Sequence, residues 1–168
     1  MKAGENGKPA WCYYENKTSN GTKYGKLYNW DAVNDPRGIA PKGYHIPSDE
    51  EWTILTDYLG VISLRSVGKK RVFTAGELKA SKKMKSSFGW NENGNGTNSS
   101  GFAGFPGGCR GHDGVFYNIG SKGYWWSATE REVGSGSAWS RYLDCRNVHI
   151  FSYYNSKQDA FSVRCLGD

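Results

Sequence analysis

The sequence predicts an α+β fold with many loops, in which one or two helices in the N-terminal half precede a small antiparallel sheet. Three observations predict this class: a complete helix signal near residue 50, short strand-like segments after residue 101, and 23 glycines that keep every apolar run short. The length of 168 residues suits one domain, residues 1–168, which would bury roughly two-thirds of its unfolded surface. Aromatic residues form 15% of the chain, so large rings are expected to fill the core.

The clearest element is a helix over residues 48–60. Ser48 can cap it, and Glu51 stands three residues later, as in a capping box. Residues 49–51 are all acidic and favour the positive end of the helix dipole. Gly60 supplies the stop signal. The apolar residues at helical spacing are Trp52, Leu55, Tyr58 and Leu59.

Two further features of the first hundred residues have structural interpretations. Residues 24–33 predict a short helix or turn that carries aromatic core residues, and we expect His45 to be packed or hydrogen-bonded within the fold rather than to bind a ligand. Residues 89–101 read GWNENGNGTNSSG, which is typical of a long loop. Aromatic residues continue on both sides of this stretch, so we expect a loop within one domain.

The remainder of the chain predicts an irregular antiparallel sheet. Its apolar segments are short, and glycines or asparagine-rich turns separate them. The segments expected to form strands are residues 102–105, 115–119, 124–127, 138–143, 148–153 and 160–165.

The net charge of +6 is concentrated in residues 65–85, which hold eight basic residues against the single acid Glu77. Such a segment indicates either a patch for nucleic acid or a solvated, lysine-rich connection. Nucleic-acid grooves interleave aromatic rings with basic residues, and only Phe73 and Phe88 are available here. We therefore favour the solvated connection and expect no nucleic-acid partner. No stretch approaches the roughly 20 apolar residues of a membrane span, so no membrane insertion is expected.

The cysteines leave two possibilities open. Cys12, Cys109, Cys145 and Cys165 have no CxxC spacing of the kind found in cysteine-only zinc sites, and three pairings are possible if all four are oxidised. Cys12 and Cys165 lie near the ends of the chain, and the termini of a domain commonly lie close together. The alternatives are a Cys12–Cys165 bridge and four separate buried thiols.

Motifs for catalysis are missing. The sequence contains no GxxxxGK[ST], GxSxG or HExxH, and its three histidines are far apart. The best enzyme hypothesis is Cys109 as a nucleophile beside Arg110 and near His112, but this spacing matches no catalytic arrangement. Asp113-Gly114 is typical of a surface turn. We therefore predict no catalytic residue, no metal site and no cofactor.

Five motifs follow one another along the chain: residues 24–30 (YGKLYNW), 43–52 (GYHIPSDEEW), 101–110 (GFAGFPGGCR), 123–130 (GYWWSATE) and 161–165 (FSVRC). Together they resemble the Fibrobacter succinogenes major paralogous domain family, from about Trp11 to the end of the chain. This family is common in secreted and surface proteins of Bacteroidetes and Fibrobacter relatives, so the resemblance implies an extracellular, cell-surface or virion location. It also implies a C-type-lectin-like fold, of the broad class shared with formylglycine-generating enzymes.

The resemblance does not imply sugar binding, because the Glu-Pro-Asn and Trp-Asn-Asp calcium motifs of C-type lectins are missing. Some relatives with this fold resemble the variable proteins of diversity-generating retroelements, in which template Asn codons are randomised to a restricted set of residue types. Members of that set here are Ser140, Tyr142, Asp144, Cys145, Arg146, His149, Phe151 and Ser152. Ordinary drift in an exposed sheet would also produce such a set, so both explanations stay open.

Residues 130–156 are the predicted variable, ligand-binding region. Side chains alternate along a strand, so burial of Trp139 and Leu143 would expose the set that includes Ser140 and Tyr142. The predicted ligand-binding residues are Ser140, Tyr142, Asp144, Arg146, His149, Phe151, Ser152 and Tyr154. Tyrosine, serine and arginine are typical of adaptable protein-binding surfaces. We therefore predict a non-enzymatic binding domain for a protein or glycan partner on a cell surface.

Two other functions remain open. One is an enzyme of the formylglycine-generating-like fold, which would use Cys109 or Cys165. The other is a structural module that assembles into surface appendages.

Overall fold

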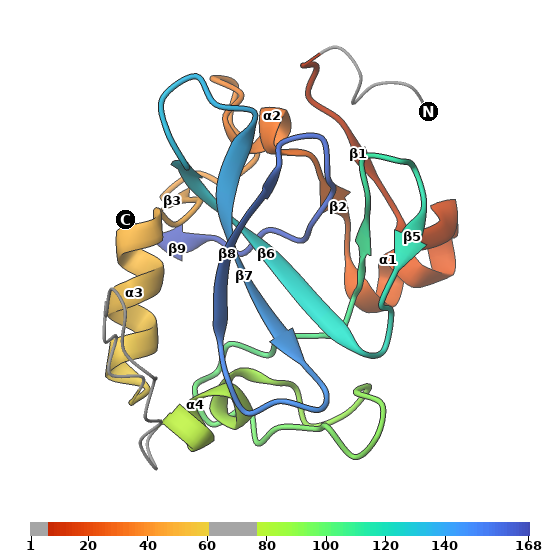
Figure 1. Cartoon of the computed structure of the whole chain (residues 1–168), viewed down its shortest axis with the longest axis vertical. Helices are drawn as coiled ribbons and strands as arrows, with labels where there is room; N and C mark the ends of the chain where they lie inside the picture. Colours follow the sequence, from red (N-terminus) through yellow and green to blue (C-terminus); the bar gives the residue numbers. More distant parts are fainter. Residues whose placement is uncertain (1–6, 61–76) are drawn as a thin grey trace.

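The computed structural model describes residues 7–60 and 77–168 and confirms the α+β class, with short helices in the N-terminal half (Figure 1). That half contains β1 (Trp11–Cys12), the 3-10 helix η2 (Tyr14–Asn16), α1 (Thr18–Tyr24), β2 (Leu27–Tyr28), α2 (Trp30–Val33), β3 (Tyr44–His45), α3 (Asp49–Tyr58) and α4 (Glu77–Met84). The second half contains β4 (Cys109–Arg110), β5 (Phe116–Tyr117), β6 (Lys122–Glu130), β7 (Ser137–Asp144), β8 (Phe151–Ser156) and β9 (Leu166–Gly167).

The central element is an antiparallel sheet with the strand order β6-β7-β8. In Figure 1 it crosses the middle of the molecule, between α3 on one side and the β1–β2 pair on the other. Tyr142 of β7 lies opposite Tyr124 of β6 and Phe151 of β8, which fixes the register of all three strands. Three two-stranded antiparallel pairs, β1-β2, β3-β9 and β4-β5, surround this sheet.

Most of the predicted elements are confirmed. Helix α3 has both hydrogen bonds of the capping box between Ser48 and Glu51. Four predicted strand segments overlap β5, β6, β7 or β8. The other two are wrong as strands. Residues 160–165 make isolated bridges to three different elements, β2, β4 and β6, and residues 102–105 make a single bridge, so neither segment has one continuous partner strand. Residues 89–101 form a loop, as expected.

The central sheet is covered on both faces. One cluster contains Trp52, Leu59, Ala80, Met84, Trp90, Trp125, Leu143, Cys145 and Ile150. The other contains Trp30, Val33, Ile46, Cys109, Trp126, Ala138 and Phe161. Trp125 and Trp126 enter different clusters because successive side chains of a strand point to opposite faces. Covering both faces of β7 contradicts the expectation that one face of this strand is open to a partner.

The Cys12–Cys165 bridge does not form. All four cysteines, which lie within the described residues, are free thiols. Cys12 belongs to β1 and packs with Leu27, whereas Cys165 directly precedes β9 and lines a cavity with Trp52. Figure 1 places β1 and β9 on opposite sides of the central sheet.

The basic segment lies mostly outside the described residues, which resume at residue 77. At its end, Lys85 contradicts the expectation of a solvated connection, because only 2% of this residue is exposed. None of the helices described here is long and apolar enough to cross a bilayer.

Candidate ligand-binding surface

The predicted site residues gather around the end of β7, the turn that follows it, and the start of β8. Of the eight, the structure brings five together at the turn: Tyr142, Asp144, Arg146, His149 and Phe151. The other three, Ser140, Ser152 and Tyr154, lie elsewhere on the two strands.

The structure corrects the prediction that Ser140 is a ligand-binding residue. Its side chain is fully buried, and its hydroxyl donates to Asn155 Oδ1 at 2.9 Å. Ser140 lies opposite Trp126 in the sheet, on the face that packs against the second core cluster. A partner therefore has no access to this side chain.

Three partly buried aromatic rings form a row across the sheet at the turn. The rings of Tyr142 and Phe151 are stacked, with centroids 4.4 Å apart and an interplanar angle of 6°. On the other side of Tyr142, the ring of Tyr124 has its centroid 5.6 Å from that of Tyr142. The Tyr124 ring also stacks on Phe161, which lies in the core. The ring of His149 is edge-on to that of Phe151, and their centroids are 6.0 Å apart. Tyr124 was missed from the sequence, although pairing the 124–127 and 138–143 segments as a hairpin would have placed it beside Tyr142.

Charged groups flank the aromatic row. Arg146 is exposed, and its Nε donates to Glu92 Oε2 at 2.6 Å while its Nη2 pairs with Oε1 of the same carboxylate. This contact lowers the pKa of Glu92. The Asp144 carboxylate accepts from the Arg146 amide at 2.9 Å and lies 3.6 Å from Lys122 Nζ. Glu92, in the long loop, could not be found from sequence because its pairing joins positions 54 residues apart.

The backbone of the turn is held from beneath by Lys85. Its Nζ donates to the carbonyl oxygens of Asp144 at 2.6 Å and Asn147 at 2.8 Å. The same ammonium lies 5.0 Å from the centre of the Trp90 ring. Burial lowers the pKa of Lys85 to about 8. The turn therefore presents its side chains from a fixed backbone, which reduces the entropy lost on binding.

The remaining predicted residues lie farther along β8. Ser152 is exposed, and Tyr154 is half-buried, with its ring edge-on to Trp139 and 4.0 Å from the Arg131 guanidinium. Because side chains alternate, these two point away from the face that carries Phe151. Tyr153 is 54% exposed, and its ring stacks on that of Tyr154, with centroids 5.0 Å apart.

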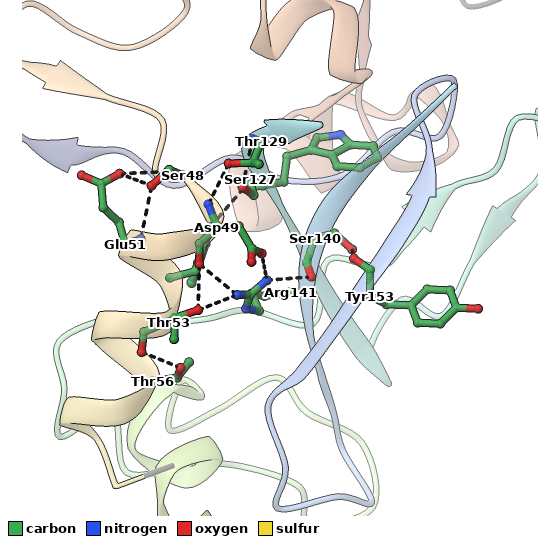
Figure 2. A network of polar contacts seen from close by, with 12 residues as sticks. Ser48, Asp49, Glu51, Thr53, Thr56, Ser127, Thr129, Ser140, Arg141 and Tyr153 are labelled. Carbon is green, nitrogen blue, oxygen red and sulfur yellow. Dashed lines mark hydrogen bonds and ion pairs between the residues drawn. The ribbon is translucent and has the colours of Figure 1, made fainter. Parts of the chain in front are cut away.

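Strand β7 is also tied to helix α3 (Figure 2). Arg141 is buried, and its guanidinium donates to Asp49 Oδ1 at 2.5 Å and to the Asp49 carbonyl at 3.2 Å. Figure 2 shows this side chain reaching from β7 to the first turn of the helix, where Thr53 also lies within hydrogen-bond distance. Arg141 therefore positions the strand and is not part of the exposed surface.

The cysteine chemistry is unfavourable for catalysis. Burial raises the pKa of Cys109 to about 12, and burial also raises the pKa of Cys165. Both thiols therefore stay protonated near neutral pH, whereas a cysteine nucleophile must be a thiolate. Within residues 7–60 and 77–168, no group of three or more His, Cys, Asp or Glu side chains is arranged to hold a metal ion.

Comparison with known proteins gives one finding. No curated protein and no solved structure matches the chain. The family model described as the Fibrobacter succinogenes major domain matches residues 2–166, which is nearly the whole chain and includes all five sequence motifs. The chain therefore belongs to the Fibrobacter succinogenes major domain family.

Proposed function

We propose that this chain is a non-enzymatic binding domain whose ligand contacts the turn between β7 and β8. The observation that carries the proposal is the stacked row of Tyr142 and Phe151, flanked by the exposed Arg146 and set on a turn that Lys85 holds in place. Aromatic and arginine side chains on a rigid support are typical of binding hot spots.

Among protein and glycan ligands, the geometry favours a protein. A sugar ring packs flat on an open aromatic face, but the two faces of Tyr142 are covered by Phe151 and Tyr124. The edges of these rings, with the guanidinium of Arg146 and the exposed Tyr153, suit an irregular protein surface better. The partner and the domain would then meet at a cell or virion surface.

Two finer assignments belong to the same proposal. One is a C-type-lectin-like fold, which the pairing of β3 with β9 supports by bringing distant parts of the chain together. The other is diversification by a retroelement at exposed positions such as Arg146 and Ser152. Ser140 and Cys145 are excluded from the useful diversified set because they are buried. A near-copy of the coding region for residues 125–165 that differs mainly at adenines, found beside the gene, would support diversification; its absence would refute it.

The binding proposal is tested with Arg146→Ala combined with Tyr153→Ala. Both side chains are exposed, so we expect an unchanged melting temperature and at least a tenfold loss of affinity for the partner. The measurement is the saturable binding of the labelled domain to a panel of intact bacterial cells. Protease treatment of the cells should abolish binding, whereas periodate treatment, which destroys glycans, should not.

The matched control is Lys42→Ala combined with Tyr44→Ala. It removes one cation and one tyrosine of similar exposure, 52% for Tyr44 against 54% for Tyr153, from the side of the molecule that carries β3. The control should bind like the unmodified domain. Equal loss in both double variants, or no loss in the Arg146 variant, would refute the placement of the binding surface. Loss after periodate alone would replace the protein partner with a glycan.

A further inference from the structure

A second cavity lies away from the β7–β8 turn, between β1 and the hairpin formed by β4 and β5. It has a volume of about 220 Å³, smaller than the usual site for a drug-sized molecule. Its lining includes Trp11, Asn16, Arg110, Phe116 and Gln158. Figure 1 shows β1 and β5 side by side, on the flank opposite α3. With Asn29, which also lines it, the cavity therefore combines two aromatic walls, three amide side chains and one arginine.

Arg110 differs from every other arginine in the described part of the chain. Each of the others pairs with a protein oxygen, as Arg37 does with Asp35 and Arg164 with the Phe102 carbonyl. In the same part of the chain, the Arg110 guanidinium makes no hydrogen bond or ion pair, and its one ring interaction is with Phe116, whose centre is 6.0 Å away. Its hydrogen-bond donors are therefore available to an acceptor in the cavity.

The nearby acids form no ion pair with Arg110, and each accepts hydrogen bonds from other donors. Asp113 accepts from the Tyr117 hydroxyl at 2.5 Å and from the Val115 amide at 3.0 Å. Asp159 accepts from the amide of His112 at 2.8 Å, and its carboxylate also lies 3.2 Å from the ring Nδ1 of His112. Within residues 7–60 and 77–168, the Arg110 guanidinium therefore has no carboxylate partner at the wall of the cavity.

The backbone and the hairpin turn fix the position of the guanidinium. The amide of Arg110 donates to the Ala160 carbonyl at 3.0 Å, and its carbonyl accepts from the Ala160 amide at 2.7 Å. A Cβ atom at Gly114 would lie 3.0 Å from Arg110 Nη2, so the turn passes directly against the guanidinium. Gly114 also has a positive φ of 84°, which glycine adopts without strain. An arginine held in this way loses little entropy when it binds an acceptor.

We propose that this cavity binds a small carboxylate ligand, with Arg110 as the anion-binding residue. A guanidinium presents two parallel N–H groups that match the two oxygens of a carboxylate. The rings of Trp11 and Phe116 would cover the flat or apolar part of the ligand, and Gln158 supplies a neutral polar contact. The ammonium of Lys26, which lies 4.0 Å from the centre of the Trp11 ring, adds attraction for an anion.

The carboxylate has two possible sources, a uronic acid of an acidic sugar or a free aromatic acid. The experiment therefore titrates the full chain with glucuronate and with benzoate, and uses glucose and benzamide as neutral counterparts. Binding is followed by shifts of backbone amide signals in NMR spectra. We expect saturable shifts in β4 and β5 with at least one carboxylate and none with its neutral counterpart. Inorganic phosphate that binds as tightly as the carboxylate would overturn the ligand class.

Three variants test the role of Arg110. Arg110→Gln should weaken carboxylate binding at least tenfold, and Arg110→Lys should give an intermediate loss because the charge stays but the paired donors are lost. Gln158→Ala, at an exposed position, should weaken binding severalfold without affecting folding, and so tests the cavity even if an Arg110 variant fails to fold. Lys42→Gln is the control for an equal change in charge.

If neither glucuronate nor benzoate binds saturably, the proposal is overturned. Unchanged affinity in Arg110→Gln would also overturn it, since the anion would then sit elsewhere. The carboxylate experiment can fail or succeed independently of the partner-binding experiment. The Arg146 and Tyr153 variants leave this cavity intact, and the Arg110 variants leave the β7–β8 turn intact.

Discussion

At the scale of single residues, two buried cations hold the central sheet to its surroundings. Arg141 joins β7 to the carboxylate and carbonyl of Asp49 at the start of α3. Lys85 binds two backbone carbonyls of the turn that follows β7. A buried charge is costly unless hydrogen bonds compensate it, and both residues meet this condition with oxygens from distant parts of the chain. Their role is to fix the support of the proposed binding surface.

Lys85 gives the first pH-dependent prediction. Its pKa is about 8 in the folded protein and near 10.4 in the unfolded chain, so between these values the unfolded state binds more protons and stability rises with pH. The predicted quantity is the difference in the free energy of unfolding between the unmodified protein and the Lys85→Met variant. This difference should increase by about 1–2 kcal/mol from pH 7.5 to pH 9.5. Urea unfolding at both pH values measures it. The cysteines and tyrosines titrate in both proteins and cancel, so a constant difference would contradict a buried, depressed lysine.

At the scale of elements, α3 shows how a local signal survives into the fold. Ser48 Oγ accepts from the Glu51 amide at 3.2 Å, and the Glu51 carboxylate accepts from the Ser48 amide at 2.8 Å. These bonds satisfy backbone donors that a helix leaves free at its start. The helix then packs against β6 and β7, so its first turn is also the contact point for Arg141.

Replacing the cap of α3 should destabilise the whole domain. Ser48→Ala removes the acceptor for the Glu51 amide, and we expect a loss of about 1 kcal/mol in the free energy of unfolding. Ser19→Ala, at an exposed position of the short helix α1, is the matched control and should change stability by a few tenths of a kcal/mol at most. Chemical denaturation of both variants measures the effect. Equal losses in the two would mean that the cap does not stabilise α3.

At the scale of the whole molecule, His45 joins Asp168, 123 residues away, to the start of α3. Its Nδ1 lies 2.7 Å from Asp168 Oδ1, and its Nε2 lies 2.9 Å from Glu51 Oε1. Strand β3 pairs with β9 beside it. The expectation that His45 is a hydrogen-bonded structural residue is therefore confirmed, and the residue links the C-terminal strand to the start of α3.

The His45 contacts predict a loss of stability as the pH rises. Hydrogen bonds to Asp168 and Glu51 raise the pKa of His45 above its unfolded value near 6.5. The stability from protonated His45 is therefore complete below pH 6.5 and is lost as the pH rises through the raised pKa. Melting temperatures from pH 5.5 to 8 should show this fall. Asp168→Asn removes the contact that contributes most to the raised pKa of His45, so the fall in melting temperature should end at a lower pH. The same dependence of melting temperature on pH in both proteins would contradict this linkage.

Local signals in the sequence were sufficient for several parts of this structure. The capping box and apolar spacing predicted α3 because they act over a few residues. Short apolar segments separated by turn residues predicted the segments of β6, β7 and β8, and the ordered motifs predicted the family to which the chain belongs. The grouping of Tyr142, Arg146 and Phe151 near one turn was also accessible, since these residues are close in sequence.

Contacts between distant segments were decided only by the tertiary structure. The second core cluster buries Ser140, and the opposite positions of β1 and β9 separate Cys12 from Cys165. The part of the fold that the structure describes leaves Arg110 without an ion pair beside a cavity. The sequence by itself determined helix α3 and the segments of β6, β7 and β8, because hydrogen bonding and side-chain periodicity within a segment are local. Which face of a strand is covered, and which charge finds a partner, depends on packing between segments far apart in the chain, and only the assembled fold contains that information.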